Sequence, residues 1–398
     1  MSKGLIASQS CQAAIVGGGP AGLACAIAMA QAGVATILIA RRSPYADNRT
    51  TALLGNSIVF LESLEVWPRC RDQSAALRVM RLIDDTGRLV RSPEVKFSSD
   101  EIGMEAFGYN IANRDLLAAL SERAMQLPNL TWIDDDARSV TPGDEAVTIE
   151  TLQGNRISAT LVVGADGRHS LCREAAGIAM KSRELGQSAL TLNLAHTRPH
   201  NGCSVEFHTA SGPCVFVPLP GNNSSVVWVV TPDEAARLKS LTDEHLGDAV
   251  ERQSHSIFGR MTVAPGRHAF PLAIEKPAHL AARRIVLIGE AAHVLPPIGA
   301  QGLNMGLRDA ADIVEIVRAA LTGGEDIGSD ALLQRYERDR SADIFSRTFA
   351  VDIANRTLLS DFLPVQSLRA AGLHALNAFG PIRRMAMREG LSPSWRRA

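Results

Sequence analysis

The stretch Ala14-Ile15-Val16-Gly17-Gly18-Gly19-Pro20-Ala21-Gly22 decides the fold of this 398-residue chain. Its apolar, β-branched start predicts a buried strand over 12–16, and the glycines predict a tight turn followed by a helix over 20–32. In such a unit Gly17 permits the turn, Gly19 lets the backbone approach a pyrophosphate, and Gly22 lets the helix pack closely on the strand. Because the first turn of the helix offers free N–H groups to phosphate, the stretch predicts a dinucleotide-binding turn.

Two later segments have the same character, Leu161–Arg168 and Arg284–His293. Each is an apolar run that ends in glycine and an acidic residue, as expected of a buried parallel strand that delivers its carboxyl end to a ligand. We expect the carboxylate of Glu290 to accept hydrogen bonds from sugar-like hydroxyl groups. The stretch 296–302, Pro-Pro-Ile-Gly-Ala-Gln-Gly, cannot be helical, and a helix is expected from about Leu303. The start of that helix is suited to stabilise negative charge on a ring carbonyl.

Composition excludes several other classes of protein. Lys and Arg number 41 and Asp and Glu number 42, which gives a net charge of −1 and no basic field for nucleic acid. The six cysteines form no C-x-x-C pair, so we expect no metal site and reduced thiols in a cytoplasmic protein. Residues 4–40 carry no charge, but the glycines and proline of the turn argue against a membrane helix or signal peptide there.

In these three segments and their order, the chain resembles the class A flavoprotein monooxygenases, which share the fold of para-hydroxybenzoate hydroxylase. Their pattern is a first dinucleotide motif, a central Asp-Gly motif and a late Gly-Asp motif, all serving one FAD. The resemblance implies an α/β fold: a Rossmann-like FAD-binding domain interleaved with a smaller antiparallel-sheet substrate domain, plus C-terminal helices. The expected segments are 1–80, 110–180 and 273–335 for the FAD domain, 81–109 and 181–272 for the substrate domain, and 336–398 for the helices.

The same resemblance implies a set of FAD-binding residues. The first motif would hold the pyrophosphate, Asp166 and Gly167 would lie where flavin and nicotinamide binding meet, and Glu290 would contact the ribityl chain. The loop 47–53 resembles the family loop whose arginine reaches the flavin, and 113–117 resembles the helix start whose arginine approaches FAD. The cofactor-binding residues expected in this way are Gly17, Gly19, Gly22, Arg49, Arg114, Asp166, Gly167, Glu290, Pro297, Gly299, Gly302, Leu303 and Asn304.

Two residues depart from the family pattern. The strand 34–39 is followed by Ala40 where the family has an acid for the adenosine ribose, and Glu290 replaces the usual aspartate of the late motif. We therefore expect altered FAD binding. Arg41 and Arg42, which follow Ala40, would suit the 2′-phosphate of NADP or lie on the surface as solvated charges, and the sequence leaves both open.

The middle and the end of the chain are less specific. Short β-like runs at 188–195, 204–207, 214–217 and 225–230, completed near 268–272, predict an antiparallel sheet over the flavin. Five residues are candidates for the apolar wall of a substrate pocket or, equally, for ordinary sheet core: Phe216, Pro218, Leu219, Pro220 and Trp228. His196, His208 and His293 are weak candidates for acid–base work. The apolar, arginine-bearing stretch 346–390, with helices broken at Pro364 and Pro381, would cap the core, pair with a second subunit or rest on a membrane.

The resemblance implies an FAD-dependent aromatic hydroxylase that uses NAD(P)H as a transient reductant and O2 through a C4a-hydroperoxyflavin. Subfamily signals around Arg308-Asp309-Ala310 and 336–340 are closest to the ubiquinone-biosynthesis hydroxylases, which implies a polyprenylated, lipid-soluble phenol as substrate. The sequence gives no catalytic base, ring position or oligomeric state, and an oligomer, a biosynthetic complex or peripheral contact with the inner face of the membrane stays open. The alternatives are a catabolic hydroxylase of a small phenol or benzoate, an NADP-dependent reductase without flavin, and a non-catalytic flavin-binding subunit.

Overall fold

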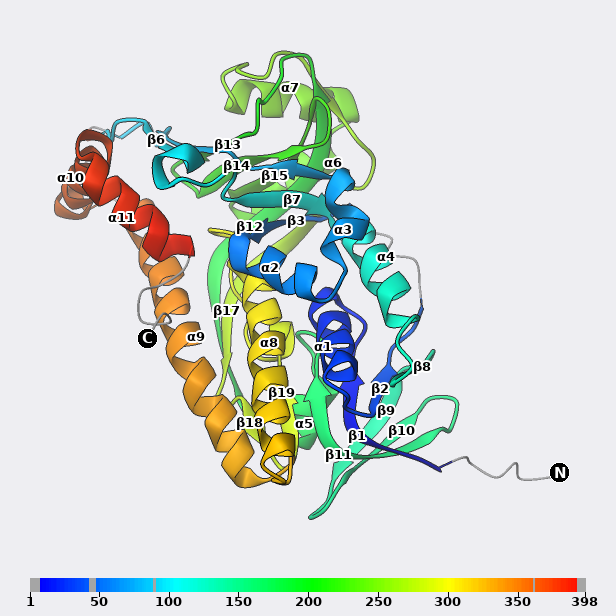
Figure 1. Ribbon diagram of the computed structural model, residues 1–398. Coiled ribbons are helices and arrows are strands. Elements are labelled where there is room, and N and C mark those ends of the chain that lie inside the picture. Colours follow the sequence, from blue (N-terminus) through cyan, green and yellow to red (C-terminus); the bar gives the residue numbers. More distant parts are fainter. Residues whose placement is uncertain (1–7, 43–47, 89–90, 361, 392–398) are drawn as a thin grey trace.

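The structure is a computed structural model that describes residues 8–42, 48–88, 91–360 and 362–391. Two large sheets lie one above the other, with a small sheet and several helices between them and a long helix along one side (Figure 1). The predicted α/β fold class, with C-terminal helices, is confirmed. Within the described residues, no helix is both long and apolar enough to cross a membrane.

The lower sheet has the strand order β18-β19-β11-β1-β2-β8, in which all pairs are parallel except β18 with β19, and β9 and β10 extend it from β11 as an antiparallel ribbon. Its strands are β1 (Ser8–Val16), β2 (Thr36–Ile39), β8 (Leu130–Ile133), β9 (Ala137–Pro142), β10 (Val147–Thr151), β11 (Arg156–Gly164), β18 (Ala281–Ala282) and β19 (Ile285–Leu287). Parallel pairing of β1 with β11 and of β11 with β19 sets the three sequence motifs side by side at their carboxyl ends. These strands are buried on both faces, which explains their unbroken apolar runs.

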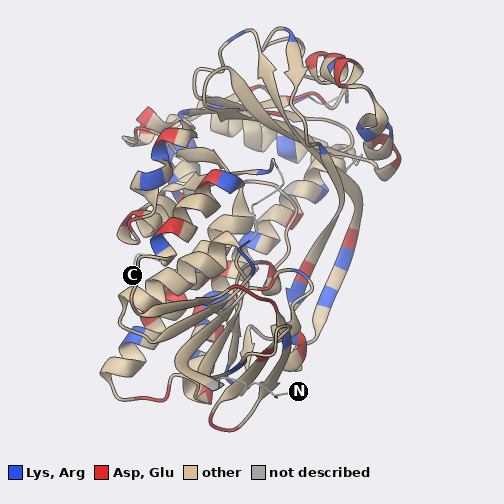
Figure 2. Cartoon of the chain, turned by 90° about the vertical axis from the view of Figure 1, so that its right-hand side faces the viewer, with Lys and Arg blue, Asp and Glu red and all other residues tan. Residues whose placement is uncertain are grey.

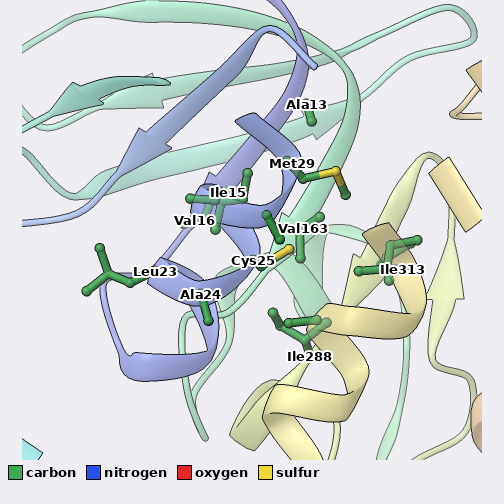
Figure 3. Packing of buried hydrophobic residues seen from close by; sticks show 14 of the residues in the cluster. Ala13, Ile15, Val16, Leu23, Ala24, Cys25, Met29, Val163, Ile288 and Ile313 are labelled. Carbon is green, nitrogen blue, oxygen red and sulfur yellow. The ribbon is translucent and has the colours of Figure 1, made fainter. Parts of the chain in front are cut away.

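Helices α1 (Pro20–Gln31) and α8 (Gln301–Thr322) pack on each other and on this sheet, with α4 (Asn113–Ala124) on the other side of α1. Their contact is a dry cluster in which Cys25 and Met29 of α1 lie against Val163, Ile288 and Ile313 (Figure 3). Small residues let α1 approach closely, since a Cβ at Gly22 would lie 2.1 Å from the carbonyl oxygen of Gly17. The short helix α5 (Leu171–Ala175) follows β11.

The upper sheet has the order β16-β12-β15-β14-β13-β5-β6, with β17 also paired to β12. Its strands are β5 (Val79–Asp84), β6 (Val95–Ser98), β12 (Met180–His196), β13 (Cys203–His208), β14 (Pro213–Leu219), β15 (Asn223–Val230), β16 (Met261–Val263) and β17 (His268–Pro277). It is antiparallel apart from the parallel pair β5–β13. The long strands β12 and β17 descend from it toward the lower sheet (Figure 1).

Helices α6 (Pro232–Ser240) and α7 (Asp243–Gln253) cover the outer face of the upper sheet. Between the two large sheets lie the small sheet and two short helices: β3 (Thr50–Leu54), β4 (Ser74–Ala76), β7 (Gly108–Ala112), α2 (Gly55–Ser63) and α3 (Trp67–Cys70). The chain ends in α9 (Asp330–Leu359), α10 (Leu363–Ala378) and α11 (Gly380–Leu391), and its helix breaks fall near the two predicted prolines. Figure 2 shows acidic and basic residues interspersed on the helices and at strand ends, without a large single-sign face in that view.

Candidate active site

The three motifs meet at one point above the lower sheet. The amide N–H of Ala165 donates to the carbonyl of Val16 at 2.8 Å, and the N–H of Ile288 donates to Gly164 at 3.0 Å. A Cβ at Gly17, whose φ is 115°, would lie 2.2 Å from the carbonyl oxygen of Ala165. Gly17 is therefore glycine because the second motif occupies the space beside it.

Other predicted glycines border open space. A Cβ added to Gly19, Gly167 or Gly302 would meet no heavy atom within 4 Å. Gly19 caps the N-terminus of α1 with an extended backbone, so the first N–H groups of that helix point past a position without a side chain. A glycine turn with this open approach fits the pyrophosphate of FAD, while Gly17 and Gly22 are required by packing.

Asp166 binds its own loop. One carboxylate oxygen accepts a hydrogen bond from Ser170 Oγ at 2.6 Å, and the other accepts the N–H of Cys172 at 3.0 Å. These two hydrogen bonds fix the start of α5 and the turn after β11 in which Gly167, whose φ is 80°, lies. The next residue, Arg168, donates to Glu275 of β17 through Nε and a terminal nitrogen at 3.0 and 2.6 Å. That hydrogen bond, together with the nearby charge of Glu290, raises the pKa of Arg168.

The third motif leads into the start of α8. Glu290 is exposed, in a single turn at Gly289–Ala291, and Gly299 and Ala300 both have left-handed backbones, with φ of 64° and 53°. Helix α8 begins at Gln301, two residues before the expected Leu303, and Gly302 and Leu303 lie in its first turn. Pro297 and Gly299 lie in the irregular stretch before it. This loop brings the bare backbone and the helix N-terminus together, as the sequence predicts.

The side chain of Asn304 links three elements by hydrogen bonds that the sequence did not suggest. Its side-chain oxygen accepts the N–H of Leu54 at 2.9 Å and the hydroxyl of Ser57 at 2.7 Å, and its amide donates to the carbonyls of Ala52 and Ala300 at 2.8 and 2.6 Å. The buried side chain thus ties β3 and α2 to α8. Its place beside the isoalloxazine stays a prediction.

The two predicted arginines come from neighbouring elements. The N–H of Asn113 donates to the carbonyl of Arg49 at 2.9 Å, next to the paired strands β3 and β7. Arg114 is the next residue, with a side chain 62% exposed and its Nε 3.5 Å from Asp115. Both arginines therefore lie at the edge of the small sheet. Asp47, the first residue of the predicted flavin loop, lies outside the described residues.

Ala40 and the arginines after it have partners within the fold. A Cβ at Gly18 would lie 2.8 Å from the Cβ of buried Ala40, whose carbonyl accepts the indole N–H of Trp132 at 2.8 Å. Arg41 contacts Asp136 at 2.5 Å, and the guanidinium of Arg42 lies 4.9 Å from the ring centre of Trp132. These contacts favour the interpretation of Arg41 and Arg42 as surface charges over a role in binding a 2′-phosphate.

The upper sheet corrects the predicted pocket wall. Phe216 is 0% exposed and packs with Phe258 at 5.2 Å between ring centres, in the core under α6 and α7. Trp228 lies in the same core, so both are sheet core, the alternative that the sequence left open. Since side chains alternate along a strand, Val215, Val217 and Val227 lie on the opposite face, which points to the lower half of the molecule.

The inner face of this sheet is partly buried, and the rows of β12, β14 and β15 on it carry no charged side chain. The register of β12, β14 and β15 sets the following residues on it: Ala189, Thr191, Asn193, Val215, Val217, Leu219, Asn223, Ser225, Val227 and Val229. At one end it contacts the small sheet, where Thr50 Oγ1 donates to Ser225 Oγ at 2.8 Å. Farther along it stands over the region that the flavin motifs border, as an uncharged, largely apolar wall.

Sequence reasoning missed a buried ion cluster behind the third motif. It consists of His293, Arg308, Asp309, Asp312, Arg340, Asp343 and Arg347. Asp309 Oδ2 pairs with His293 at 2.7 Å and accepts the N–H of Gly289 at 3.0 Å, and Asp309 Oδ1 contacts Arg340. Burial alone would raise the pKa of Asp309, but the charges of His293 and Arg340 lower it to about 2. The available signal was the spacing of three and four between ionisable residues on α8 and α9.

The ion cluster reaches the loop at the start of α8. Arg347 of α9 donates to Asp343 at 2.9 Å and to Oε1 of Gln301, the first residue of α8, at 2.9 Å. Tyr336, also on α9, donates to the carbonyl of Leu287 at 2.9 Å. Helix α9 therefore fixes both ends of the loop that carries Pro297 and Gly299. No group of three or more His, Cys, Asp or Glu residues suited to a metal occurs in the described part of the chain.

Comparison with known proteins agrees with this geometry. Residues 10–346 match the family model described as an FAD binding domain. The chain belongs to this family. It is 32% identical to ubiquinone hydroxylase UbiL of Rhodospirillum rubrum, over 95% of this chain and 88% of that protein, and 28% identical to 3-demethoxyubiquinol 3-hydroxylase of Escherichia coli, over 96% and 99%. The crystal structure of p-nitrophenol 4-monooxygenase PnpA from Pseudomonas putida superposes with a TM-score of 0.79 at 19% identity, covering 96% of this chain and 98% of that one.

The family assigns FAD as the cofactor and an FAD-dependent monooxygenase as the class of enzyme. When bound, the flavin supplies the redox chemistry that activates O2 for transfer of one oxygen atom. The flavin-free reductase suggested by Arg41 and Arg42 does not agree with membership of an FAD-binding family.

Proposed function

We propose that this protein hydroxylates a polyprenylated phenol on the way to ubiquinone, with NAD(P)H as the electron donor and O2 as the oxygen source. The observation that carries the proposal is the part of the inner face of the upper sheet around Val215, Val217 and Val227, where the rows of β12, β14 and β15 carry no charged side chain. A benzoate or salicylate would need a cation to pair with its carboxylate, and the inward rows of β12, β14 and β15 have none. The names of the relatives, ubiquinone hydroxylase and 3-demethoxyubiquinol 3-hydroxylase, support the same substrate class.

For the cofactor we propose the cradle expected from the sequence. Gly17, Gly19 and Gly22 form the turn for the pyrophosphate, and Asp166 with Gly167 orders the second strand end. The third motif, from Glu290 to Asn304, supplies the ribityl contact and the backbone beside the ring system. Arg49 and Arg114 reach FAD from the edge of the small sheet. The open space beside Gly19, Gly167 and Gly302 supports this assignment.

The test uses purified protein loaded with FAD. Substrate-dependent NAD(P)H oxidation and an oxygen-bearing product, detected as a mass gain of one oxygen atom, are measured with a short-chain polyprenyl phenol, with 4-hydroxybenzoate and with salicylate. We expect product from the polyprenyl phenol. Efficient turnover of the soluble acids, with no binding or stimulation by the polyprenyl analogue, would favour the catabolic alternative. Bound FAD without turnover of any phenol would favour a non-catalytic flavin subunit.

We also propose peripheral contact with an anionic lipid surface through the C-terminal helices, which would bring a lipid-soluble substrate within reach. Large apolar side chains are exposed on these helices: Phe345, Phe349, Ile353, Phe362, Leu363, Leu368, Phe379, Ile382 and Met385. Lys276 lies 5.5 Å from the ring centre of Phe345. On the same helix, α9, Asp352 pairs with Arg356 and with Arg183 of β12. Apolar side chains beside cations suit an interface with acidic headgroups.

Flotation with phosphatidylglycerol vesicles tests this contact. We expect the wild-type protein to float with anionic vesicles, and a Phe345→Ser, Phe349→Ser variant to stay at the bottom of the gradient with its FAD spectrum unchanged. If the wild-type protein ignores the vesicles but its mass in solution falls to the monomer only in the variant, the same side chains cover a second copy of the chain.

A further inference from the structure

Two ionisable side chains of β13 interrupt the apolar inner face of the upper sheet. Val205 and Phe207 of this strand are buried in the core under α7, so the alternating residues Glu206 and His208 lie on the inner face. His208 Nε2 lies 2.9 Å from Glu206 Oε1. Both side chains are mostly buried but keep some contact with solvent, with 23% of Glu206 and 15% of His208 exposed.

Glu206 is surrounded by apolar neighbours. Directly opposite it in the sheet are Val215 on β14 and Leu82 on β5, both half-buried, and Val227 follows on β15. A carboxylate in such a place is costly unless it is hydrogen-bonded. With the proton on Nε2, the imidazole of His208 donates to Oε1, and Oε2 has no hydrogen bond from it. A partly exposed carboxylate on this inner face is suited to accept a hydrogen bond from a ligand hydroxyl group.

We propose that Glu206, oriented by His208, accepts the phenolic hydroxyl of the substrate and acts as the proton acceptor in hydroxylation. The inference rests on the proposed function, because it requires a phenol in the pocket. As the ring carbon forms its bond to one oxygen atom of O2, the O–O bond breaks and the other oxygen atom leaves as water, with the two electrons supplied by NAD(P)H. The phenolic O–H bond breaks in the same step and its proton passes to Glu206, which leaves the ring as a dienone. The hydrogen on the hydroxylated carbon then leaves as a proton to solvent, and the carbonyl oxygen regains its proton from Glu206.

The other charged groups that face this pair are already engaged. Asp84, opposite His208 on β5, accepts hydrogen bonds from the N–H of Ser92 at 2.9 Å and from Arg369 of α10 at 2.8 Å. Burial would raise the pKa of Asp84, but these hydrogen bonds and that of Thr86 lower it, so Asp84 stays ionised at neutral pH. Asp84 and Arg369 form their own pair beside His208, which leaves Glu206 as the carboxylate closest to the centre of the apolar face.

The experiment compares Glu206→Gln and His208→Asn with a matched surface variant, Glu234→Gln, whose carboxylate pairs with Arg237 on α6. All are loaded with FAD and assayed with the phenol that the wild-type enzyme hydroxylates best. Loss of a proton acceptor is expected to lower kcat by about 10²–10⁴-fold in Glu206→Gln. NAD(P)H oxidation should continue with hydrogen peroxide released in place of product, and the acid limb of the pH–rate profile should disappear. His208→Asn should shift that limb and lower kcat less.

Two results separate failure of this inference from failure of the proposed function. If the wild-type protein hydroxylates no phenol, the proposed function fails. If the wild-type protein hydroxylates a phenol and Glu206→Gln retains its kcat, its ratio of product to NAD(P)H and its pH profile, then Glu206 is not the proton acceptor. The absorption spectrum of bound flavin and the melting temperature of each variant show whether a loss of rate comes from misfolding.

Discussion

Replacing Arg340 with methionine removes a guanidinium that contacts three carboxylates of the ion cluster. Arg340 is 0% exposed and lies 2.7–2.8 Å from Asp309, 3.0 Å from Asp312 and 2.8 Å from Asp343. Methionine has a similar volume, so the main effect is on charge. The cluster holds three carboxylates and three guanidinium groups besides His293, and the substitution removes one positive charge and leaves Asp309, Asp312 and Asp343 each without one cationic partner.

Removing one partner of a buried ion pair lowers the free energy of unfolding by about 3–5 kcal/mol, because the remaining charge is left uncompensated. Asp309 keeps His293 and the N–H of Gly289, and Asp343 keeps Arg308 and Arg347. We therefore expect the free energy of unfolding to fall by a value near the lower end of that range. Since Gly289 and the loop before α8 depend on this cluster, the FAD affinity should fall as well.

Urea denaturation followed by circular dichroism, together with fluorescence titration of FAD, measures both effects. Arg318→Met is the matched control, because Arg318 lies on the surface of α8 and pairs with Glu315 three residues away. It should change the stability by less than about 0.5 kcal/mol. Adding Asp309→Asn to Arg340→Met should recover part of the loss. A loss below about 1 kcal/mol in Arg340→Met, with no recovery in the double variant, would refute this account of the cluster.

Three further outcomes follow from the geometry. Gly19→Ala should leave the melting temperature of the FAD-free protein unchanged and weaken FAD binding, since its Cβ meets nothing within 4 Å; an unaltered dissociation constant for FAD would contradict the cradle. Phe216→Ala should destabilise the fold by about 3–5 kcal/mol. Val217→Ala should instead change KM for the phenol with little effect on stability. Equal melting temperatures of the two variants would contradict the assignment of the two faces. The pKa of Asp309, about 2 in the folded state, lies below its unfolded value. Ionised Asp309 therefore adds roughly 2 kcal/mol to the free energy of unfolding above about pH 4, and this stabilisation is lost as the pH falls through 2. An Asp309→Asn variant with unchanged acid denaturation would exclude this contribution.

The motif strands were predictable because their signals are local. A glycine such as Gly17 reports a backbone conformation, and an apolar run reports burial on both faces, so 12–16 and 161–164 can be read within a few residues. The ion cluster was not predictable in the same way. Asp309 and Arg340 are about thirty residues apart on two helices, and only their packing shows that their charges neutralise each other.

The sequence left the core-facing row of the upper sheet undecided for a different reason. In a sheet with one wet face, apolar and polar residues alternate and the buried row is evident. In β14 both rows are apolar, with Cys214 and Phe216 on one face and Val215 and Val217 on the other, so alternation carries no information. Docking of α6 and α7 selects the first row as core. The absence of polar residues from the second row of β14 fits the apolar substrate that we propose.

The departures at Ala40 and Glu290 fit a single structural account. A Cβ at position 18 would already crowd Ala40, so this strand end and the glycine turn fit closely, and the room for an acidic side chain on the ribose side is small. The polar contacts of FAD must then come from elsewhere in the cradle. We propose that the third motif supplies them, since it carries the longer, exposed Glu290, and Asp309, paired with Arg340, accepts the N–H of Gly289 behind it. Rigidity in that loop would compensate for the missing acceptor, because a preordered loop loses less conformational entropy when it binds a ligand.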